Sequence, residues 1–363
     1  MSFVDVDDVQ RAGFAPASPL AEAGALAAVR ESGRHGFPFG MPVSVERSRH
    51  MALVQARRYW VTPKLNGTRV AVVFARHDTT AVAVLMDRGR RMFGVHFTAA
   101  PAVLFQGTVC DAELVQRPAD GSWHVWVFDI AVLAGKPVHD PLSKRLQVLS
   151  RICGTLACPT ATFACKPMAP LQDPFDDTVV RAALEGFPCD GIILTPEQEP
   201  ASRPGTAASV LKVKAVHTLD LQWTDGPGGS EGGDAALWFG DAMDMVSVHK
   251  LRTVVRTQGF PPRAPSGPGV VVEVAIDSVT DKQLVLSFVS TRPSKEAPNN
   301  ALCVLRTLVS AADNVTFDEV RTWCPAAVPG NCLPDPEVSG PAQGAPSEEA
   351  SAAAASSARC AAP

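Results

Sequence analysis

Five short runs of apolar and β-branched residues lie in the first 200 positions, and several of them are separated by only a few residues. Runs of this length and composition predict strands. They cover residues 69–75, 80–87, 107–115, 124–130 and 191–196. A parallel strand pair needs a long crossover connection, usually a helix. Because the short gaps leave no room for one, the sequence predicts an α+β fold with antiparallel sheets.

A helix is indicated between the fourth and fifth runs. Apolar residues recur there at helical spacing. They are Leu142, Leu146, Leu149 and Ile152. Asp140 and Pro141 precede them as an N-cap and an N1 proline, which is typical of a helix start. Val179, Ala183 and Leu184 suggest a second helix.

The second half of the chain begins after a glycine-rich segment at residues 224–234, which is either a linker or a long hairpin loop. Two further strands are predicted over residues 270–276 and 284–290. One helix then starts at about Asn300, and another at Thr316, whose hydroxyl and Glu319 form a capping box. This half therefore reads as a small β-barrel with attached helices.

Composition and charge limit the function classes. Apolar residues make up 46% of the chain, and no apolar run approaches the roughly 18 residues of a membrane span. The acidic N-terminus differs from a signal peptide, so we expect a protein that is intracellular and not secreted. The net charge is −4, so any nucleic-acid contact must come from a local basic patch. The Pro-rich, small-residue tail at 331–363 has little to bury and is expected to be disordered.

Lys64 is the first candidate for chemistry. The segment TPKLNGTRVAV places it just before a tight Asn-Gly turn that leads Arg69 into a strand. Nearby cations and partial burial lower the pKa of a lysine amine and make it a nucleophile. Lys212 and Lys214 alternate in SVLKVKAV and so share a strand face. The alternative is an ordinary hairpin turn with a solvated lysine.

Further motifs suited to phosphoryl chemistry follow in order along the chain. They read KLNGTR (64–69), LMDRGRRMFGV (85–95), DAELV (111–115), VFDI (127–130), DGIIL (190–194), LKVKAV (211–216) and RPSKEAPNN (292–300). This series resembles the covalent nucleotidyltransferases, the superfamily of mRNA-capping guanylyltransferases and ATP-dependent polynucleotide ligases. The resemblance covers roughly residues 37–310.

Three details resemble the capping branch. A proline- and phenylalanine-containing leader with a Ser-x-x-Arg segment precedes Lys64. An L-x-D-R segment, with Asp87 and Arg88, is followed by the aromatic Phe93. The last motif has the form R-x-x-K-x-x-P-N, whereas ligases carry a differently spaced basic cluster. Its residues are Arg292, Lys295, Pro298 and Asn299.

The resemblance implies that Lys64 attacks the α-phosphate of GTP, releases pyrophosphate and holds GMP through a phosphoamide bond. RNA with a 5′-diphosphate end then takes the GMP. Lys212 and Lys214 would stabilise charge on the transferring phosphoryl group, and Lys214 is favoured for the α-phosphate. Arg292 and Lys295 would reach the β- and γ-phosphates when the C-terminal domain closes. For these last two, the alternative is a solvated loop.

A wider set of residues is expected to bind the nucleotide by the same resemblance. It comprises Lys64, Asn66, Gly67, Arg69, Arg88, Glu113, Phe128, Asp190, Lys212 and Lys214. Phe128 would stack on guanine while Asp129 steadies the site, although an aromatic in such a strand is more often core. Glu113 would hold either the ribose or a divalent metal, and Asp190 would hold a metal and its waters. The metal would be Mg²⁺ or Mn²⁺, since Mg²⁺ suits carboxylates and substrate phosphates together.

The implied fold is an α+β nucleotidyltransferase domain of antiparallel sheets with helices, ATP-grasp-like and of the adenylation type, followed by a C-terminal OB-fold barrel. The expected boundaries are an N-terminal extension with a helix (1–36), the nucleotidyltransferase domain (37–223), the OB-fold domain with C-terminal helices (224–330) and the tail (331–363).

Two positions depart from the commonest family pattern. Asn66 replaces the usual aspartate after the nucleophile, and Ser294 stands where an aspartate usually precedes the lysine of the last motif. The rival functions are an ATP-dependent RNA or DNA ligase that adenylylates Lys64, and a non-catalytic RNA-binding relic of the fold.

A stand-alone transferase of this length resembles those of large DNA viruses and fungi. Its expected location is the nucleus or a viral replication compartment. A separate RNA triphosphatase, a cap methyltransferase and RNA polymerase are its candidate partners.

Overall fold

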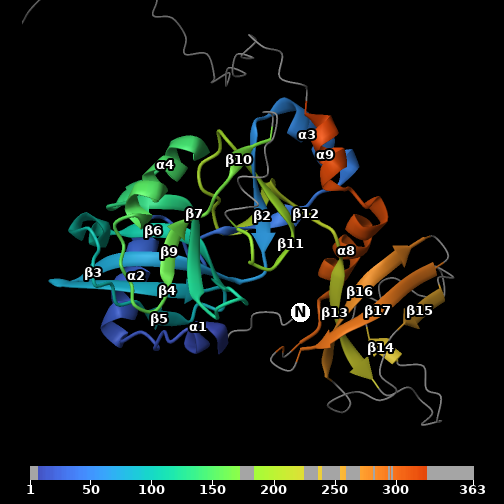
Figure 1. The fold of residues 1–363 in the computed structure, drawn as a ribbon, viewed down its shortest axis with the longest axis horizontal. Coiled ribbons are helices and arrows are strands. Elements are labelled where there is room, and N and C mark those ends of the chain that lie inside the picture. The colour runs from blue at the N-terminus through green and yellow to red at the C-terminus, as the bar shows by residue number, and fades with distance from the viewer. Residues whose placement is uncertain are drawn as a thin grey trace, which may run out of the picture. The chain divides into compact units, whose positions relative to one another are not determined.

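The structure is a computed structural model, and it describes residues 7–171, 184–224, 236–238, 254–258, 270–280, 283–292, 295 and 297–324. The described strands form three sheets, and the sheets are mostly antiparallel (Figure 1). The predicted α+β class is therefore confirmed. Among the described helices, none has the length and apolar character needed to cross a membrane.

The first sheet has the order β5-β4-β3-β6-β7-β8, with β9 paired to β7. Its strands are β3 (Thr68–His77), β4 (Thr80–Asp87), β5 (Met92–Gly94), β6 (Thr108–Gln116), β7 (Trp123–Leu133), β8 (Lys136–Pro137) and β9 (Thr162–Cys165). Four of the predicted strands lie here as β3, β4, β6 and β7, with ends shifted by a few residues.

Both faces of this sheet are buried. On β3, Val72 and Phe74 face one core while Ala71 and Val73 face another. Helix α4 (Leu142–Cys153) covers the first face and α2 (Pro19–Glu31) the second (Figure 1). Burial on both sides explains why β3 is almost continuously apolar rather than alternating. Helix α1 (Asp7–Arg11) precedes α2, and the 3₁₀ helix η1 (Ala102–Gln106) precedes β6.

The second sheet has the order β1-β12-β11-β2-β10. Its strands are β1 (Gly40–Ser44), β2 (Tyr59–Leu65), β10 (Ala169–Pro170), β11 (Cys189–Pro196) and β12 (Gly205–Lys214). One face packs against α3 (Arg47–Ala56) and the C-terminal helix α9 (Phe317–Trp323), through Val54, Val320 and Trp323. The end of the described chain thus returns to the core that lies behind Lys64.

The third sheet has the order β14-β13-β16-β17-β15. Its strands are β13 (Thr218–Thr224), β14 (Ala236–Trp238), β15 (Val254–Gln258), β16 (Val271–Val279) and β17 (Gln283–Thr291), and α8 (Ala301–Asp313) packs on it through Val304. The two strands predicted here are confirmed as β16 and β17. The passage from the second sheet to the third falls at residues 215–217, ahead of the glycine-rich segment. The strands on either side of this segment, β13 and β14, pair antiparallel.

Some local predictions were wrong in detail. The N-cap of α4 is Pro141, with no capping side chain, and Asp140 instead accepts a hydrogen bond from Arg145 through its carbonyl. The Thr316 hydroxyl does cap α9 by accepting from the Glu319 amide, but the Glu319 carboxylate binds Arg47 of α3 instead of closing the capping box. A long-range ion pair has replaced the local contact.

The pairs β1–β12, β7–β9 and β15–β17 are parallel. The members of each pair lie far apart in the sequence, so the argument from short gaps did not apply to them. Val179, Ala183, Ser294, residues 225–235 and the tail lie outside the described residues, and the predictions made there stay predictions.

One buried ion pair is suited to a stability measurement. Arg145 has 1% of its side chain exposed and binds Asp129 through Nε at 2.7 Å, with further bonds to the carbonyls of Asp140 and Glu199. We expect Arg145→Met to lower the free energy of unfolding by about 3–5 kcal/mol, because it leaves Asp129 buried without its partner.

Urea denaturation measures this change. The control is Lys144→Ala, a neighbouring exposed position of α4 that should change stability by less than about 0.5 kcal/mol. A loss no larger than that of the control would contradict the assignment of Arg145.

Candidate active site

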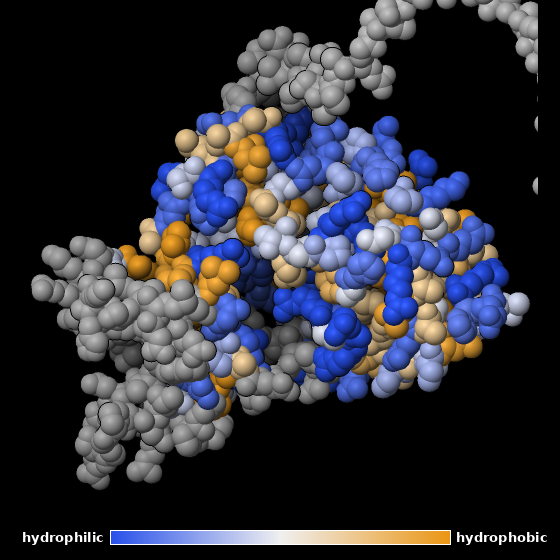
Figure 2. Space-filling view, turned by 180° about the vertical axis from the view of Figure 1, so that it is seen from behind, coloured by the Kyte–Doolittle hydropathy of each residue, from blue (hydrophilic) through white to orange (hydrophobic). Residues whose placement is uncertain are grey.

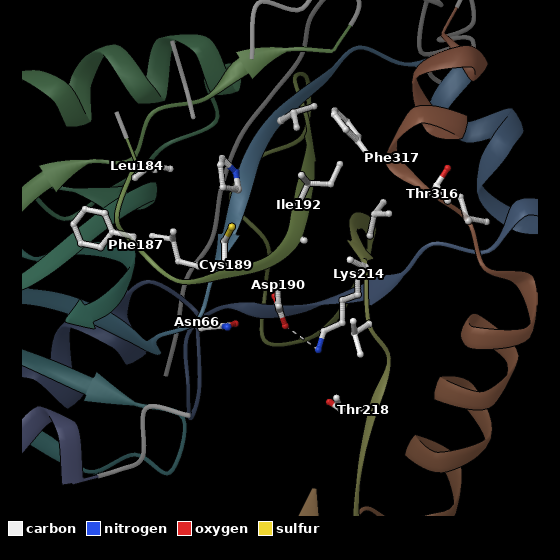
Figure 3. A pocket seen from close by; sticks show the side chains of 18 of the residues that line it. Asn66, Leu184, Phe187, Cys189, Asp190, Ile192, Lys214, Thr218, Thr316 and Phe317 are labelled. Carbon is white, nitrogen blue, oxygen red and sulfur yellow. Dashed lines mark ion pairs between the residues drawn. The ribbon is translucent and has the colours of Figure 1, made fainter. Parts of the chain in front are cut away.

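Strand β2 carries Lys64 beside a carboxylate. Lys64 Nζ donates to Asp190 Oδ1 at 2.7 Å, and Lys214 Nζ lies 3.0 Å from Asp190 Oδ2 (Figure 3 shows the Asp190–Lys214 pair). Gly191 explains the placement, because it is in register with Lys64 on one side and with Lys214 on the other. A Cβ on Gly191 would lie 2.0 Å from the Val213 carbonyl oxygen, so only glycine fits there. This close strand approach puts Asp190 between the two lysines.

The charges of this group act on one another. Burial raises the pKa of Asp190, but the charges of Lys214 and Lys64 outweigh it and hold that pKa below its ordinary value. Lys212 lies on the same strand face as Lys214, two residues away. Its pKa is lowered, first by burial and then by the charges of Lys214 and Lys64. Within the described chain, Lys212 has no ion pair.

The turn after Lys64 is not a hairpin. Strand β2 belongs to the second sheet and β3 to the first, so Asn66 and Gly67 carry the chain from one sheet to the other. The Asn66 amide donates to the Pro188 carbonyl, and a Cβ on Gly67 would lie 2.5 Å from the Leu114 carbonyl oxygen. The simple alternative, a solvated lysine beside an ordinary hairpin, is therefore wrong.

Charged groups on the first sheet line the site from the other side. Arg69 forms a two-pronged contact with Asp111, with Nε–Oδ1 at 2.9 Å and Nη2–Oδ2 at 2.5 Å. Burial raises the pKa of Asp111 to about 6, although Arg69 opposes the rise. Glu113 accepts from Lys166 Nζ at 3.3 Å. The guanidinium of Arg69 lies 5.7 Å and the ammonium of Lys166 5.5 Å from the ring centre of Phe128.

These residues enclose one cavity of about 1480 Å³. Ten cations and six carboxylates line it, although the whole chain carries a net charge of −4. The cations are Lys64, Arg69, Arg88, Arg91, Lys166, Arg203, Lys212, Lys214, Arg292 and Lys295. Figure 2 shows hydrophilic side chains gathered around a hollow on the face that it presents. Such a surplus of positive charge in a cavity favours a polyanionic ligand.

Arg292 and Lys295, which follow the end of β17, also line this cavity. Both are engaged by carboxylates. Lys295 Nζ forms an ion pair with Asp220 Oδ2, while Arg292 Nη1 lies 3.2 Å from Glu273 Oε2 and 3.6 Å from Asp220 Oδ1. Lys295 thus has a carboxylate partner from β13, whatever Ser294 contributes.

A different cavity, of about 870 Å³, lies on the opposite face of the second sheet. Val61, Pro63 and Leu65 line it, whereas Thr62 and Lys64 line the first cavity, as expected from the alternation of side chains along β2. Its other walls are mainly apolar and include Phe187 and Phe317 (Figure 3). Its lining offers few charges for a phosphate.

The structure brings most of the expected site residues together. Lys64, Gly67, Arg69, Arg88, Glu113, Phe128, Lys212, Lys214, Arg292 and Lys295 all line the cation-rich cavity. Asn66 and Asp190 line the other cavity, together with Lys214, and Asp190 still reaches Lys64 through its carboxylate. Arg88 is exposed and makes no hydrogen bond or ion pair within the described residues.

Sequence reasoning missed Lys166, Asp111 and Asp220. Lys166 is 3% exposed and points into the site from just after β9, and no motif marks it. A lysine that follows a short apolar run was the only available signal. Asp111 stands in the quoted DAELV segment, but nothing there indicates that it binds Arg69. Asp220 lies between the last two motifs and depends on pairing across the third sheet.

Comparison with known proteins identifies a family for much of the chain. Residues 23–216, just over half of the chain, match the family described as mRNA capping enzyme, catalytic domain. Among solved structures, mycobacterial DNA ligase D with ATP and MES is 18% identical, with a TM-score of 0.40, and the match covers 71% of this chain and 94% of the ligase. The ATP-dependent DNA ligase from bacteriophage T7, in complex with ATP, is 14% identical, with a TM-score of 0.36, and covers 72% and 100%.

TM-scores this low add nothing to the family match. That match ends at residue 216, so the third sheet lies outside it. The match contains the motifs from Lys64 to Lys214. On this ground the chain belongs to the mRNA capping enzyme catalytic-domain family, and it is a nucleotidyltransferase.

Proposed function

We propose that the chain is a GTP-dependent mRNA guanylyltransferase. Lys64 attacks the α-phosphate of GTP, forms lysyl-GMP and releases pyrophosphate, and the GMP then passes to the 5′-diphosphate end of RNA. The observation that carries the proposal is the position of Lys64, which contacts Asp190 and lines a cavity with a surplus of four cations. A nucleophilic amine beside phosphate-binding cations is what this chemistry requires.

The attack needs a neutral amine, so Lys64 must lose a proton before the N–P bond forms. Asp190 Oδ1, at 2.7 Å, orients the amine, and the Lys64 side chain is 23% exposed, so its proton can pass to solvent. The α-phosphate–oxygen bond to pyrophosphate breaks as the N–P bond forms. The amine and pyrophosphate lie roughly in line on opposite sides of the phosphorus.

Positive charge stabilises the transferring group. Lys212 and Lys214 lie on one face of β12 and line the same cavity as Lys64. They would hold the oxygens of the α-phosphate. Arg292 and Lys295 would bind the β- and γ-phosphates, with the third sheet acting as the OB-fold domain that closes over the nucleotide. Arg69 and Arg88 would bind the ribose and the phosphates.

The preference for guanine would come from Phe128 and Lys166. A base stacked on Phe128 would have the Lys166 ammonium near its edge, since that ammonium lies 5.5 Å from the ring centre. A lysine ammonium only donates hydrogen bonds. Guanine offers the O6 and N7 acceptors, whereas adenine places an amino group where O6 would be. A donor at this edge therefore favours GTP over ATP.

Glu113 and Asp190 are the proposed ligands of Mg²⁺ or Mn²⁺. Among the described residues no group of three or more metal-binding side chains occurs, but Mg²⁺ commonly uses one or two carboxylates together with substrate phosphates and water. Two carboxylates held by lysines at the phosphate site fit that pattern. The metal would supply further charge neutralisation at the phosphates.

In the second step the RNA β-phosphate displaces Lys64 from GMP. In-line displacement places the incoming oxygen opposite Lys64, where pyrophosphate had left. Triphosphate removal and cap methylation would then be carried out by separate partner enzymes.

Covalent labelling tests the proposal. Incubation with α-³²P-labelled GTP and Mg²⁺, followed by denaturation, should leave label on the wild-type protein and none on Lys64→Ala, because this substitution removes the amine that would form the N–P bond. The control is Lys144→Ala, which removes an exposed lysine from α4. Labelling by ATP alone would make the chain a ligase, and label surviving on Lys64→Ala would exclude this nucleophile.

Substitution of Lys166 tests base selection. We expect Lys166→Met to lower the ratio of GTP to ATP labelling efficiency (kcat/KM) by roughly tenfold or more, since a charge-assisted hydrogen bond contributes about 1.5–3 kcal/mol. Lys166 also holds Glu113, so a drop in both efficiencies is expected as well. An unchanged ratio would remove Lys166 from base recognition.

A further inference from the structure

Two carboxylates face each other across the third sheet. Asp220 on β13 is directly in register with Glu273 on β16. Their side chains are only 16% and 3% exposed. Like charges directly opposite in an antiparallel ladder are destabilising, and burial makes them more so. The pair therefore needs cations to stay in this position.

Arg292 and Lys295 are those cations. Arg292 contacts both carboxylates and Lys295 contacts Asp220, so two positive charges balance two negative ones. Asn299 holds the backbone of Asp220. The backbone amide of Asn299 donates to the Asp220 carbonyl at 2.7 Å, and its side-chain oxygen accepts from the Asp220 backbone amide at 2.8 Å. We call Asp220, Glu273, Arg292 and Lys295 the carboxylate clamp.

The clamp lies at the site of phosphate binding. Asp220, Arg292 and Lys295 line the same cavity as Lys64. Each of the two cations that would bind pyrophosphate is thus already paired with a carboxylate. A phosphate oxygen can take over either cation only in competition with Asp220 and Glu273. When both cations bind phosphate, the negative charges of Asp220 and Glu273 are no longer neutralised.

We propose that Asp220 and Glu273 compete with pyrophosphate for Arg292 and Lys295 and thereby set how tightly pyrophosphate is held. The proposal rests on the function proposed above. When lysyl-GMP has formed, the return of both cations to the carboxylates favours release of pyrophosphate. The same return vacates the position that the RNA 5′ end must enter. Asp220 is a positioning residue in this scheme, because it acts through the two cations.

Binding of inorganic pyrophosphate to Asp220→Asn tests the proposal. The substitution keeps the shape of the side chain and the backbone bonds to Asn299, but it removes one negative charge. We expect the dissociation constant for pyrophosphate, measured by calorimetry on the nucleotide-free protein, to fall about three- to tenfold, because the cations lose a competitor. The pyrophosphate concentration that half-maximally reverses lysyl-GMP formation should fall by a similar factor.

Asp277→Asn is the matched control. Asp277 lies on the same strand as Glu273, but it is exposed and its carboxylate accepts from Ser287, so its loss should leave pyrophosphate binding unchanged. Glu273→Gln gives a second version of the test if Asp220→Asn does not fold. Unchanged or weaker binding of pyrophosphate in the folded variants would overturn the proposal.

The binding measurement requires no nucleotide transfer. If the wild-type protein takes no label from GTP while Asp220→Asn binds pyrophosphate more tightly, the proposed function fails and the competition stands. If labelling succeeds and pyrophosphate binding is unchanged in Asp220→Asn, the competition fails and the proposed function stands.

Discussion

The close approach of three strands at Gly191 is the constraint on which the site depends. Without a Cβ at this position, β2 and β12 both come into register with β11, and Asp190 meets Lys64 and Lys214 at once. Two lysines this close would repel each other, and the carboxylate between them offsets the repulsion. The geometry at Gly191 therefore determines both where Lys64 lies and how its charge is balanced.

The first sheet supports the site with charges turned inward. Arg69 is paired with Asp111 and Arg145 with Asp129, and in each pair at least one side chain is almost fully buried. Buried pairs contribute little net stability, but losing one partner is costly. Their consequence here is geometric, since Arg69 is held against Phe128, and Asp129, the next residue on β7, is held by Arg145. The buried ion pairs thus fix the orientation of side chains that line the cavity.

The sequence predicted what depends on local patterns. The strands β3, β4, β6 and β7 follow from apolar runs, and the motif series that begins at Lys64 named seven of the ten cations that line the cavity. Long-range pairing was out of reach. Neither Lys166 beside Glu113 nor Asp220 opposite Glu273 carries a local signal, because each partner comes from a distant strand.

The Asn66-Gly67 turn shows the same limit at short range. Its composition is typical of a hairpin, yet the strands that it joins belong to different sheets. The close contact of Gly67 with the Leu114 carbonyl oxygen required glycine, and a hairpin pattern gives no hint of that contact. The Asn-Gly sequence correctly indicated a tight turn. It could not indicate that the next strand, β3, enters the first sheet, where both of its faces are buried.

Lys212 differs from the other cations of the nucleophile's neighbourhood. Asp190 engages Lys64 and Lys214, but Lys212 has no carboxylate partner in the described part of the chain, and burial with two neighbouring lysines lowers its pKa. A phosphate placed beside it would favour the charged form and raise that pKa toward its ordinary value. Binding of a polyphosphate should therefore be coupled to proton uptake at Lys212, in the pH range between its lowered and its restored pKa. Under the proposed function, Arg292 and Lys295 would exchange one anion for another, whereas Lys212 would gain a partner of opposite charge that it lacks among the described residues.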